Sequence, residues 1–185
     1  MATYHGYITV AHNTYSAWRA ATLNNSYDVD GGFPAVQPFQ CWDFCALGYF
    51  QFGRALITKP GGGNAADCWN VSRYLNSKSP FISLTGVENI KRGDILVWNT
   101  SASLPDGHIG YADEDYNGTN YINVLGQNQG GRPYVNIQSY SLTGFLGIFR
   151  NTLWVGDEPE PVPVSSKKRK FPWAVAWAHW DNFKN

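Results

Sequence analysis

The chain has 185 residues, 43% of them hydrophobic and 16% aromatic, and its formal net charge at pH 7 is zero. This length is sufficient for one well-buried domain, and the balanced charge argues against a nucleic-acid partner. No apolar run reaches the roughly 18 residues of a transmembrane helix. Three cysteines without paired spacing predict neither a disulfide framework nor a zinc site.

The N-terminal segment lacks the basic region and the apolar core of a secretory signal peptide. Residues 15–23 instead have the composition of a short helix, for which Ser16 is the predicted N-cap. A protein that acts outside the cell without such a signal needs another route across the membrane.

Cys41 follows a loop rich in glycine and proline, and it precedes an apolar segment of helical character, residues 41–58. A thiol at a helix N-terminus lies beside unpaired backbone N–H groups and the positive end of the helix dipole. We therefore expect the pKa of Cys41 to be lowered and its sulfur to act as a nucleophile. Most free cysteines are buried hydrophobic residues, and Cys45 and Cys68 are interpreted in that way.

The second half of the chain, residues 90–154, has the pattern of strands and turns. Residues 95–98 form an apolar run after a Gly-Asp turn, and His108 begins another strand-like run. Residues 121–125 predict a further strand, which the polar residues 127–129 follow. A cysteine at a helix N-terminus, a histidine on one strand and an amide on the next is a papain-like arrangement, in which the third residue orients the imidazole.

Five segments resemble, in the same order, the motifs of CHAP domains, the cysteine, histidine-dependent amidohydrolases/peptidases that cut bacterial peptidoglycan. The run Gln40-Cys41-Trp42-Asp43 resembles the Gln-Cys-x-Asp signature of the family. The other matching segments are residues 63–69, 90–98, 107–111 and 126–128. Together they cover about residues 25–150, and the resemblance implies an α+β fold of papain-like type, with helices packed on an antiparallel sheet.

The resemblance also implies roles for individual residues. Cys41 would be the nucleophile, and His108 would serve first as general base and then as general acid. The backbone N–H of Cys41, assisted by Gln40, is expected to stabilise the oxyanion. This chemistry requires no cofactor.

A calcium site is predicted near the nucleophile. Asp28 and Asp30 stand at positions i and i+2 before two glycines, a pattern that is usually an ordinary turn but that also opens cation-binding loops. Several CHAP domains bind calcium through a similar run and through the aspartate two residues after the cysteine. The resemblance therefore favours a structural calcium ion held by Asp28, Asp30 and Asp43.

The sequence departs from the family at Gly126, which stands where the family has the glutamate of its Glu-Gln-Asn motif. Residues two apart on a strand face the same side, so Asn128 is expected to point where that glutamate would stand. We predict that Asn128 orients His108. Gln127 is a weaker candidate for that role and a candidate oxyanion or substrate contact. Alternatively, residues 127–129 are simply a polar turn.

The predicted activity is hydrolysis of an amide bond in bacterial peptidoglycan by a thiol protease-like Cys-His mechanism. The enzyme would be an endopeptidase of the stem peptide or cross-bridge, or an N-acetylmuramoyl-L-alanine amidase. A bacteriophage endolysin that passes from the host cytoplasm to the cell wall through holin pores, or a virion-associated lysin, would need no signal peptide. The alternative is a structural virion or tail component that keeps a CHAP-like domain for assembly or wall binding.

The chain is predicted to have three regions. Residues 1–155 form the hydrolase domain, residues 156–170 form a linker that is proline-rich and acidic and then basic, and residues 171–185 form an aromatic C-terminal arm. Three tryptophans of the arm share one helical face. The arm either packs on its own domain, anchors the protein at a membrane or wall surface, or docks on a virion tail protein.

Overall fold

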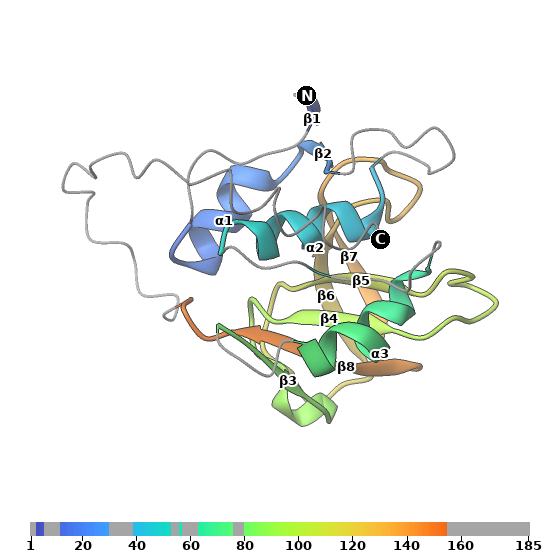
Figure 1. The fold of residues 1–185 in the computed structure, drawn as a ribbon. Coiled ribbons are helices and arrows are strands. Elements are labelled where there is room, and N and C mark those ends of the chain that lie inside the picture. The colour runs from blue at the N-terminus through green and yellow to red at the C-terminus, as the bar shows by residue number, and fades with distance from the viewer. Residues whose placement is uncertain are drawn as a thin grey trace, which may run out of the picture.

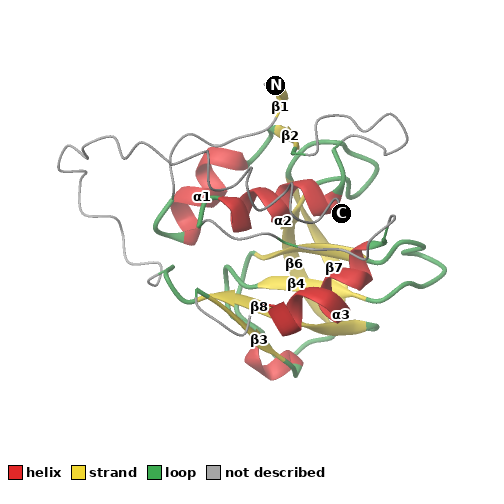
Figure 2. Cartoon of the chain, in the orientation of Figure 1, coloured by secondary structure: helices red, strands yellow, loops and turns green. Residues whose placement is uncertain are grey.

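The computed structural model describes residues 3–5, 12–29, 39–52, 56, 63–75 and 80–154. Helices pack against a large antiparallel sheet, so the predicted α+β class is confirmed (Figure 1). Figure 2 shows the same arrangement by secondary structure, with helices both above most of the large sheet and beside its strands lower in this view. Asp30 and the predicted linker and arm, residues 156–185, lie outside the described residues.

The main sheet has six strands in the order β3-β8-β4-β5-β6-β7, and neighbouring strands run antiparallel. Its strands are β3 (Phe81–Leu84), β4 (Ile95–Trp98), β5 (His108–Ala112), β6 (Tyr121–Gly126), β7 (Asn136–Ser141) and β8 (Phe145–Asn151). A short 3₁₀ helix, η1 (Val87–Asn89), precedes β4, and a separate parallel pair joins β1 (Thr3–His5) to β2 (Ser26–Asp28). The strands expected around residues 95–98, 108 and 121–125 are therefore present.

Three α-helices are described: α1 (Tyr15–Thr22), α2 (Cys41–Phe50) and α3 (Ala65–Leu75). The N-cap of α1 is Thr14, whose Oγ1 accepts the N–H of Ala17 at 3.1 Å, so the prediction of Ser16 was wrong by two positions. Helix α2 ends at Phe50, well before the predicted end at residue 58.

The strand β4 lies at the centre of the sheet and separates two clusters of buried side chains. Ile95 and Val97 belong to the cluster between the sheet and the helices, together with Trp18 and Phe44. Leu96 and Trp98 face the opposite way. Because both faces of β4 are covered, its sequence is a continuous apolar run rather than an alternating one.

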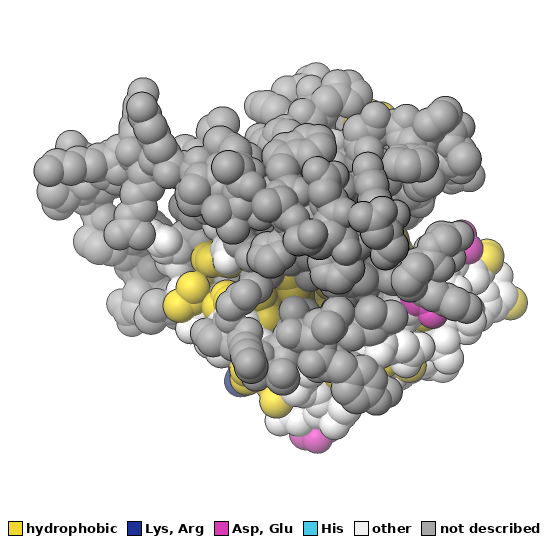
Figure 3. Space-filling view, in the orientation of Figure 1, with side chains coloured by type: hydrophobic (Ala, Val, Ile, Leu, Met, Phe, Trp, Pro, Cys, Tyr) yellow, Lys and Arg dark blue, Asp and Glu magenta, His cyan; other side chains and the backbone are white. Residues whose placement is uncertain are grey.

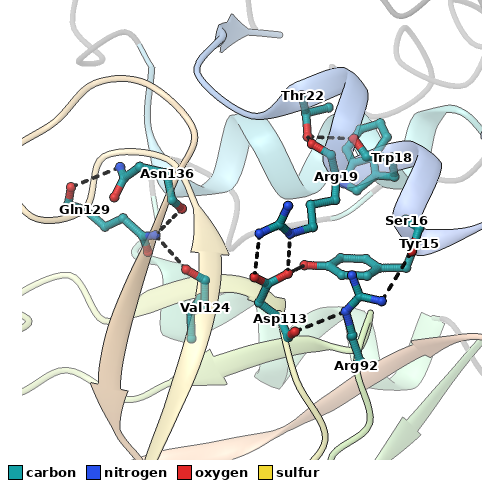
Figure 4. A network of polar contacts seen from close by, with 10 residues as sticks. All are labelled: Tyr15, Ser16, Trp18, Arg19, Thr22, Arg92, Asp113, Val124, Gln129 and Asn136. Carbon is teal, nitrogen blue, oxygen red and sulfur yellow. Dashed lines mark hydrogen bonds and ion pairs between the residues drawn. The ribbon is translucent and has the colours of Figure 1, made fainter. Parts of the chain in front are cut away.

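Polar contacts attach α1 to the end of β5 (Figure 4). The Asp113 carboxylate accepts hydrogen bonds from Nε and Nη2 of Arg19 at 2.7 and 3.1 Å and from the Tyr15 hydroxyl at 2.8 Å. Arg92 Nε donates to the Asp113 backbone carbonyl at 3.1 Å. The Asp113 side chain is only 11% exposed, so this group of contacts fixes α1 more firmly than an exposed ion pair would.

Figure 3 shows one face of the molecule, on which described hydrophobic side chains gather near the middle and acidic side chains lie nearer the edges. Among the described helices, none combines the length and the apolar character that a bilayer-spanning segment needs.

Candidate active site

Helix α2 places Cys41 at its first position, as the sequence predicts. Gln40 is the N-cap, and the Asp43 carboxylate accepts the backbone N–H groups of Gln40 at 2.7 Å and of Val29 at 3.2 Å. These bonds begin the helix at Cys41 and hold the preceding segment against it. Cys41 is partly exposed, whereas Cys45 and Cys68 are completely buried, which agrees with their interpretation as core residues.

The Cys41 sulfur lies beside the beginning of β5. Backbone N–H groups of Ile109, Trp42 and Cys41 itself are directed at the sulfur and lower its pKa. Although part of the residue is exposed, the sulfur is surrounded by protein atoms, and this desolvation has the larger, opposite effect and raises the pKa of Cys41 to about 11. The predicted lowering of this pKa was therefore wrong, because the cost of burying a thiolate exceeds the benefit of the helix N-terminus. Ile109 directly follows His108 in the sequence, so the sulfur lies close to the backbone at the start of β5.

His108 is the first residue of β5, and its side chain is buried. The imidazole stacks on the Tyr140 ring, with ring centroids 4.5 Å apart and planes 8° apart, and the Trp98 ring lies 6.0 Å away. Burial lowers the pKa of His108 to about 4, although its hydrogen bond to Gln129 acts in the opposite direction. The imidazole is therefore neutral near pH 7.

Gln129 is the hydrogen-bond partner of the imidazole, since its Oε1 lies 3.0 Å from His108 Nε2. The Gln129 Nε2 group donates to two backbone carbonyls, those of Val124 at 2.9 Å and Asn136 at 2.7 Å (Figure 4). Because both amide hydrogens are used, the oxygen must face His108, and it can only accept. His108 therefore carries its proton on Nε2, and its Nδ1 is the basic atom.

The prediction that Asn128 orients His108 was wrong. Asn128 is exposed, and its Nδ2 donates to Oε1 of Gln40 at 2.8 Å. Strand β6 ends at Gly126, and Asn128 has φ of +54°, in the left-handed region. The side-chain alternation of a strand therefore does not continue to Asn128, and the acceptor comes one residue later, from Gln129.

Gln127 is a buried structural residue, so the prediction of an oxyanion or substrate contact was also wrong. Its side chain is 0% exposed and pairs with both backbone groups of Tyr27, accepting the N–H at 2.7 Å and donating to the carbonyl at 2.7 Å. A further bond of 3.0 Å goes to the carbonyl of Gln40. Residues 127–129 thus contact both the segment before Cys41 and the imidazole of His108.

The predicted calcium ligands are only partly described. Asp28 and Asp43 are both buried, and the Asp43 carboxylate already accepts the two backbone N–H groups named above. Within the described ranges, no group of three or more His, Cys, Asp or Glu side chains is arranged to hold a metal ion. Asp28 and Asp43 by themselves do not make a calcium site. The calcium prediction therefore depends on Asp30, which lies outside the described residues.

The fold, with helices packed on an antiparallel sheet, is of the papain-like α+β class. The sequence profile of the CHAP domain family matches residues 30–128, and the chain belongs to this family. A protein of Streptococcus phage B30 named "D-alanyl-L-alanine endopeptidase" is 32% identical over 119 residues. The match covers 64% of this chain but only 25% of that protein.

Two solved structures share the fold. The endolysin LysIME-EF1 superposes with a TM-score of 0.51 at 19% identity, over 76% of this chain and 65% of that chain. Ly7917 gives a TM-score of 0.53 at 15% identity, over 78% of this chain and 63% of that chain. The chain therefore spans less than two thirds of the length of each of these relatives.

Proposed function

We propose that the protein is a peptidoglycan hydrolase that cleaves an amide bond with Cys41 as nucleophile and His108 as general base. The observation that carries the proposal is the hydrogen bond from His108 Nε2 to Gln129, which leaves Nδ1 as the basic atom of a buried imidazole beside the Cys41 segment. Membership of the CHAP family and the name of the phage relative support peptidoglycan as the substrate.

In the proposed reaction, His108 Nδ1 takes the thiol proton of Cys41 while the sulfur attacks the amide carbonyl carbon. The backbone N–H of Cys41, with Gln40, stabilises the resulting oxyanion. The imidazolium then gives its proton to the leaving amine, and a thioester remains on Cys41. Water attacks the thioester with His108 again as base, releases the new carboxyl group and restores the thiol. Oε1 of Gln129 accepts a hydrogen bond from the Nε2–H group of His108 throughout.

The bond that we favour is a peptide bond of the stem or cross-bridge. The phage relative is named as an endopeptidase, and this relative is 32% identical. Cleavage between muramic acid and L-alanine is the other outcome, and it leaves a different new terminus. A product analysis that identifies the new amine distinguishes the two.

A bacteriophage lysin is the biological setting that the relatives support. Holin-dependent release and association with the virion, including docking of the C-terminal arm on a tail protein, are part of this proposal. The alternative is a structural virion component, which the absence of a glutamate at Gly126 would favour. This support is weakened because Gln129 supplies an acceptor to His108.

The test of the proposed function is release of soluble fragments from purified cell walls. Cys41→Ser should lower the rate by about 10³-fold or more, because a serine hydroxyl is not ionised by this histidine. Cys45→Ser is the matched control, since Cys45 is one helical turn away and fully buried. It should lower the melting temperature and keep the activity of the folded protein. Equal losses of activity in both variants would contradict the assignment.

A further inference from the structure

We propose that Gly126 and Gln129 together replace an acidic side chain at position 126, with Gln129 as the residue that positions His108. Gly126 provides the space, and the Gln129 amide fills it with an uncharged acceptor. The inference rests on the proposed function, in which His108 is the general base. It adds a positioning residue and explains why a glycine occupies a position beside the imidazole.

The space beside Gly126 is filled by the Gln129 side chain. A Cβ atom built on Gly126 would lie 2.7 Å from Oε1 and 3.1 Å from Cδ of Gln129. The Gln129 amide thus occupies the volume that a side chain at position 126 would enter. Gly126 is the last residue of β6, and its φ is not among the positive values found in the described residues. Glycine is therefore needed here for space and not for an unusual backbone conformation.

The acceptor amide of Gln129 is held rigidly. Gln129 is 2% exposed, and its Nε2 donates to the carbonyls of Val124 and Asn136. The Asn136 side chain in turn donates to the backbone carbonyls of Gln129 at 3.3 Å and Tyr134 at 2.8 Å. These hydrogen bonds join the two ends of the turn between β6 and β7. The Gln129 amide therefore cannot rotate without leaving buried donors and acceptors unpaired.

Charge also distinguishes this arrangement from one with a carboxylate. Among the described residues, no charged side chain shifts the pKa of His108, whose ring neighbours include the Tyr140 ring, the Trp98 ring and the Gln129 amide. An amide fixes the tautomer but does not stabilise an imidazolium as strongly as a carboxylate would. Gly126 and Gln129 together therefore keep a hydrogen-bond acceptor on His108, as in a Cys-His-acceptor triad, without adding a negative charge beside the imidazole.

The direct test is nitrogen NMR of the His108 ring in an inactive Cys41→Ala background, which does not depend on catalysis. We expect the Nε2–H tautomer in the parent protein and loss of that tautomer preference in Gln129→Leu. Asn128→Ala is the matched control, because it removes the neighbouring amide and keeps the acceptor. A tautomer that is unchanged in folded Gln129→Leu, or that changes in Asn128→Ala, would overturn the proposal.

The second test moves the hydrogen-bond acceptor of His108 from position 129 to position 126. Gln129→Ala should lower kcat/KM for wall digestion by about 10²-fold, with most of the loss in kcat. The Gly126→Glu variant alone should be less stable than the parent, because the Gln129 amide already fills the space that the glutamate side chain would need. Gly126→Glu combined with Gln129→Ala should regain the activity lost in Gln129→Ala, and its carboxylate should raise the pKa of His108 by about 1 to 3 relative to the parent. A folded double variant with no gain over Gln129→Ala and no change in this pKa would contradict the exchange.

The two tests separate this inference from the proposed function. If the parent protein does not digest walls while the NMR result is as expected, the proposed function fails and the positioning role of Gln129 stands. If the parent digests walls and the tautomer is independent of Gln129, the function stands and the inference fails.

Discussion

At the scale of single residues, burial moves the pKa values of Cys41 and His108 in opposite directions. The pKa of Cys41 rises to about 11 and that of His108 falls to about 4. Both shifts favour the uncharged thiol and the uncharged imidazole over a thiolate–imidazolium pair. In the proposed reaction the proton is therefore transferred during the attack, and the hydrogen bond to Gln129 directs it to Nδ1.

The pH dependence of activity follows from these shifts. The reactive pair holds one proton, so activity is lost when a second proton binds His108 or when Cys41 loses its own. We expect kcat/KM to stay level through the neutral range, to fall only as the pH drops toward about 4 and to fall again as the pH rises toward about 11. The measurement is the rate of wall digestion against pH, restricted to conditions in which circular dichroism shows the folded protein.

An acidic limb near the ordinary histidine pKa of about 6.5 would contradict this account. Such a result would mean that the imidazole is less buried, or faces more negative charge, than the described residues indicate. The thiolate absorbance of the protein, compared with that of Cys41→Ser, checks the same point independently.

At the scale of elements, the turn between β6 and β7 connects the two halves of the site. Gln127 pairs with β2 and with the backbone of Gln40, Asn128 bonds the Gln40 side chain, and Gln129 holds the imidazole. Three consecutive amide side chains thus fix the relative position of α2 and β5. Removal of the buried Gln127 or Gln129 side chain is expected to disturb the nucleophile and the base, whereas Asn128, which is exposed and bonds the Gln40 side chain, does not hold the imidazole.

The predicted calcium ligands come from the end of β2, the segment after it and the first turn of α2. If Asp28, Asp30 and Asp43 hold the ion, a chelator should lower the melting temperature through the loss of ligand binding to the folded state. Asp30→Ala should lower it by the same amount and should make it insensitive to the chelator. Asp43→Ala is unsuitable for this purpose, since it also removes the acceptor that begins α2. A melting temperature that responds neither to chelator nor to added calcium would exclude the site.

The sequence predicts the elements of this fold better than it predicts the partners of the site. The buried strand β4 and the start of α2 at Cys41 follow from local signals, namely a continuous apolar run and a Gly- and Pro-rich loop before an apolar helix. The partner of His108 depends on where β6 ends. A positive φ at Asn128 is not specified by the residues alone, so the extrapolated strand selected the wrong amide. The pKa of Cys41 depends on burial by distant segments, which local sequence does not report.

At the scale of the whole molecule, Cys41, His108 and Gln129 all lie among the described residues before residue 155. The predicted linker and arm contribute none of these groups. The role of residues 156–185 can therefore be tested separately from the chemistry of the site.

Deletion of residues 157–185 should leave the digestion of isolated walls intact, because no proposed catalytic group is removed. If the arm anchors the protein at a surface, the rate on whole cells should fall. If the arm packs on its own domain, the loss of buried aromatic area, about a few kcal/mol, should lower the melting temperature. If it docks on a tail protein, the truncated chain should be absent from purified virions. A folded truncated protein that cannot cut isolated walls would show that the active unit extends beyond residue 156.

The central claim, hydrolysis of a peptidoglycan amide bond by Cys41, is tested most directly by digesting purified walls in water enriched in heavy oxygen and analysing the fragments by mass spectrometry. We predict one heavy oxygen in each new carboxyl group and one new free amine for each cleavage, with both absent for Cys41→Ser. New sugar reducing ends without new amines, or the same labelled fragments from Cys41→Ser, would contradict it.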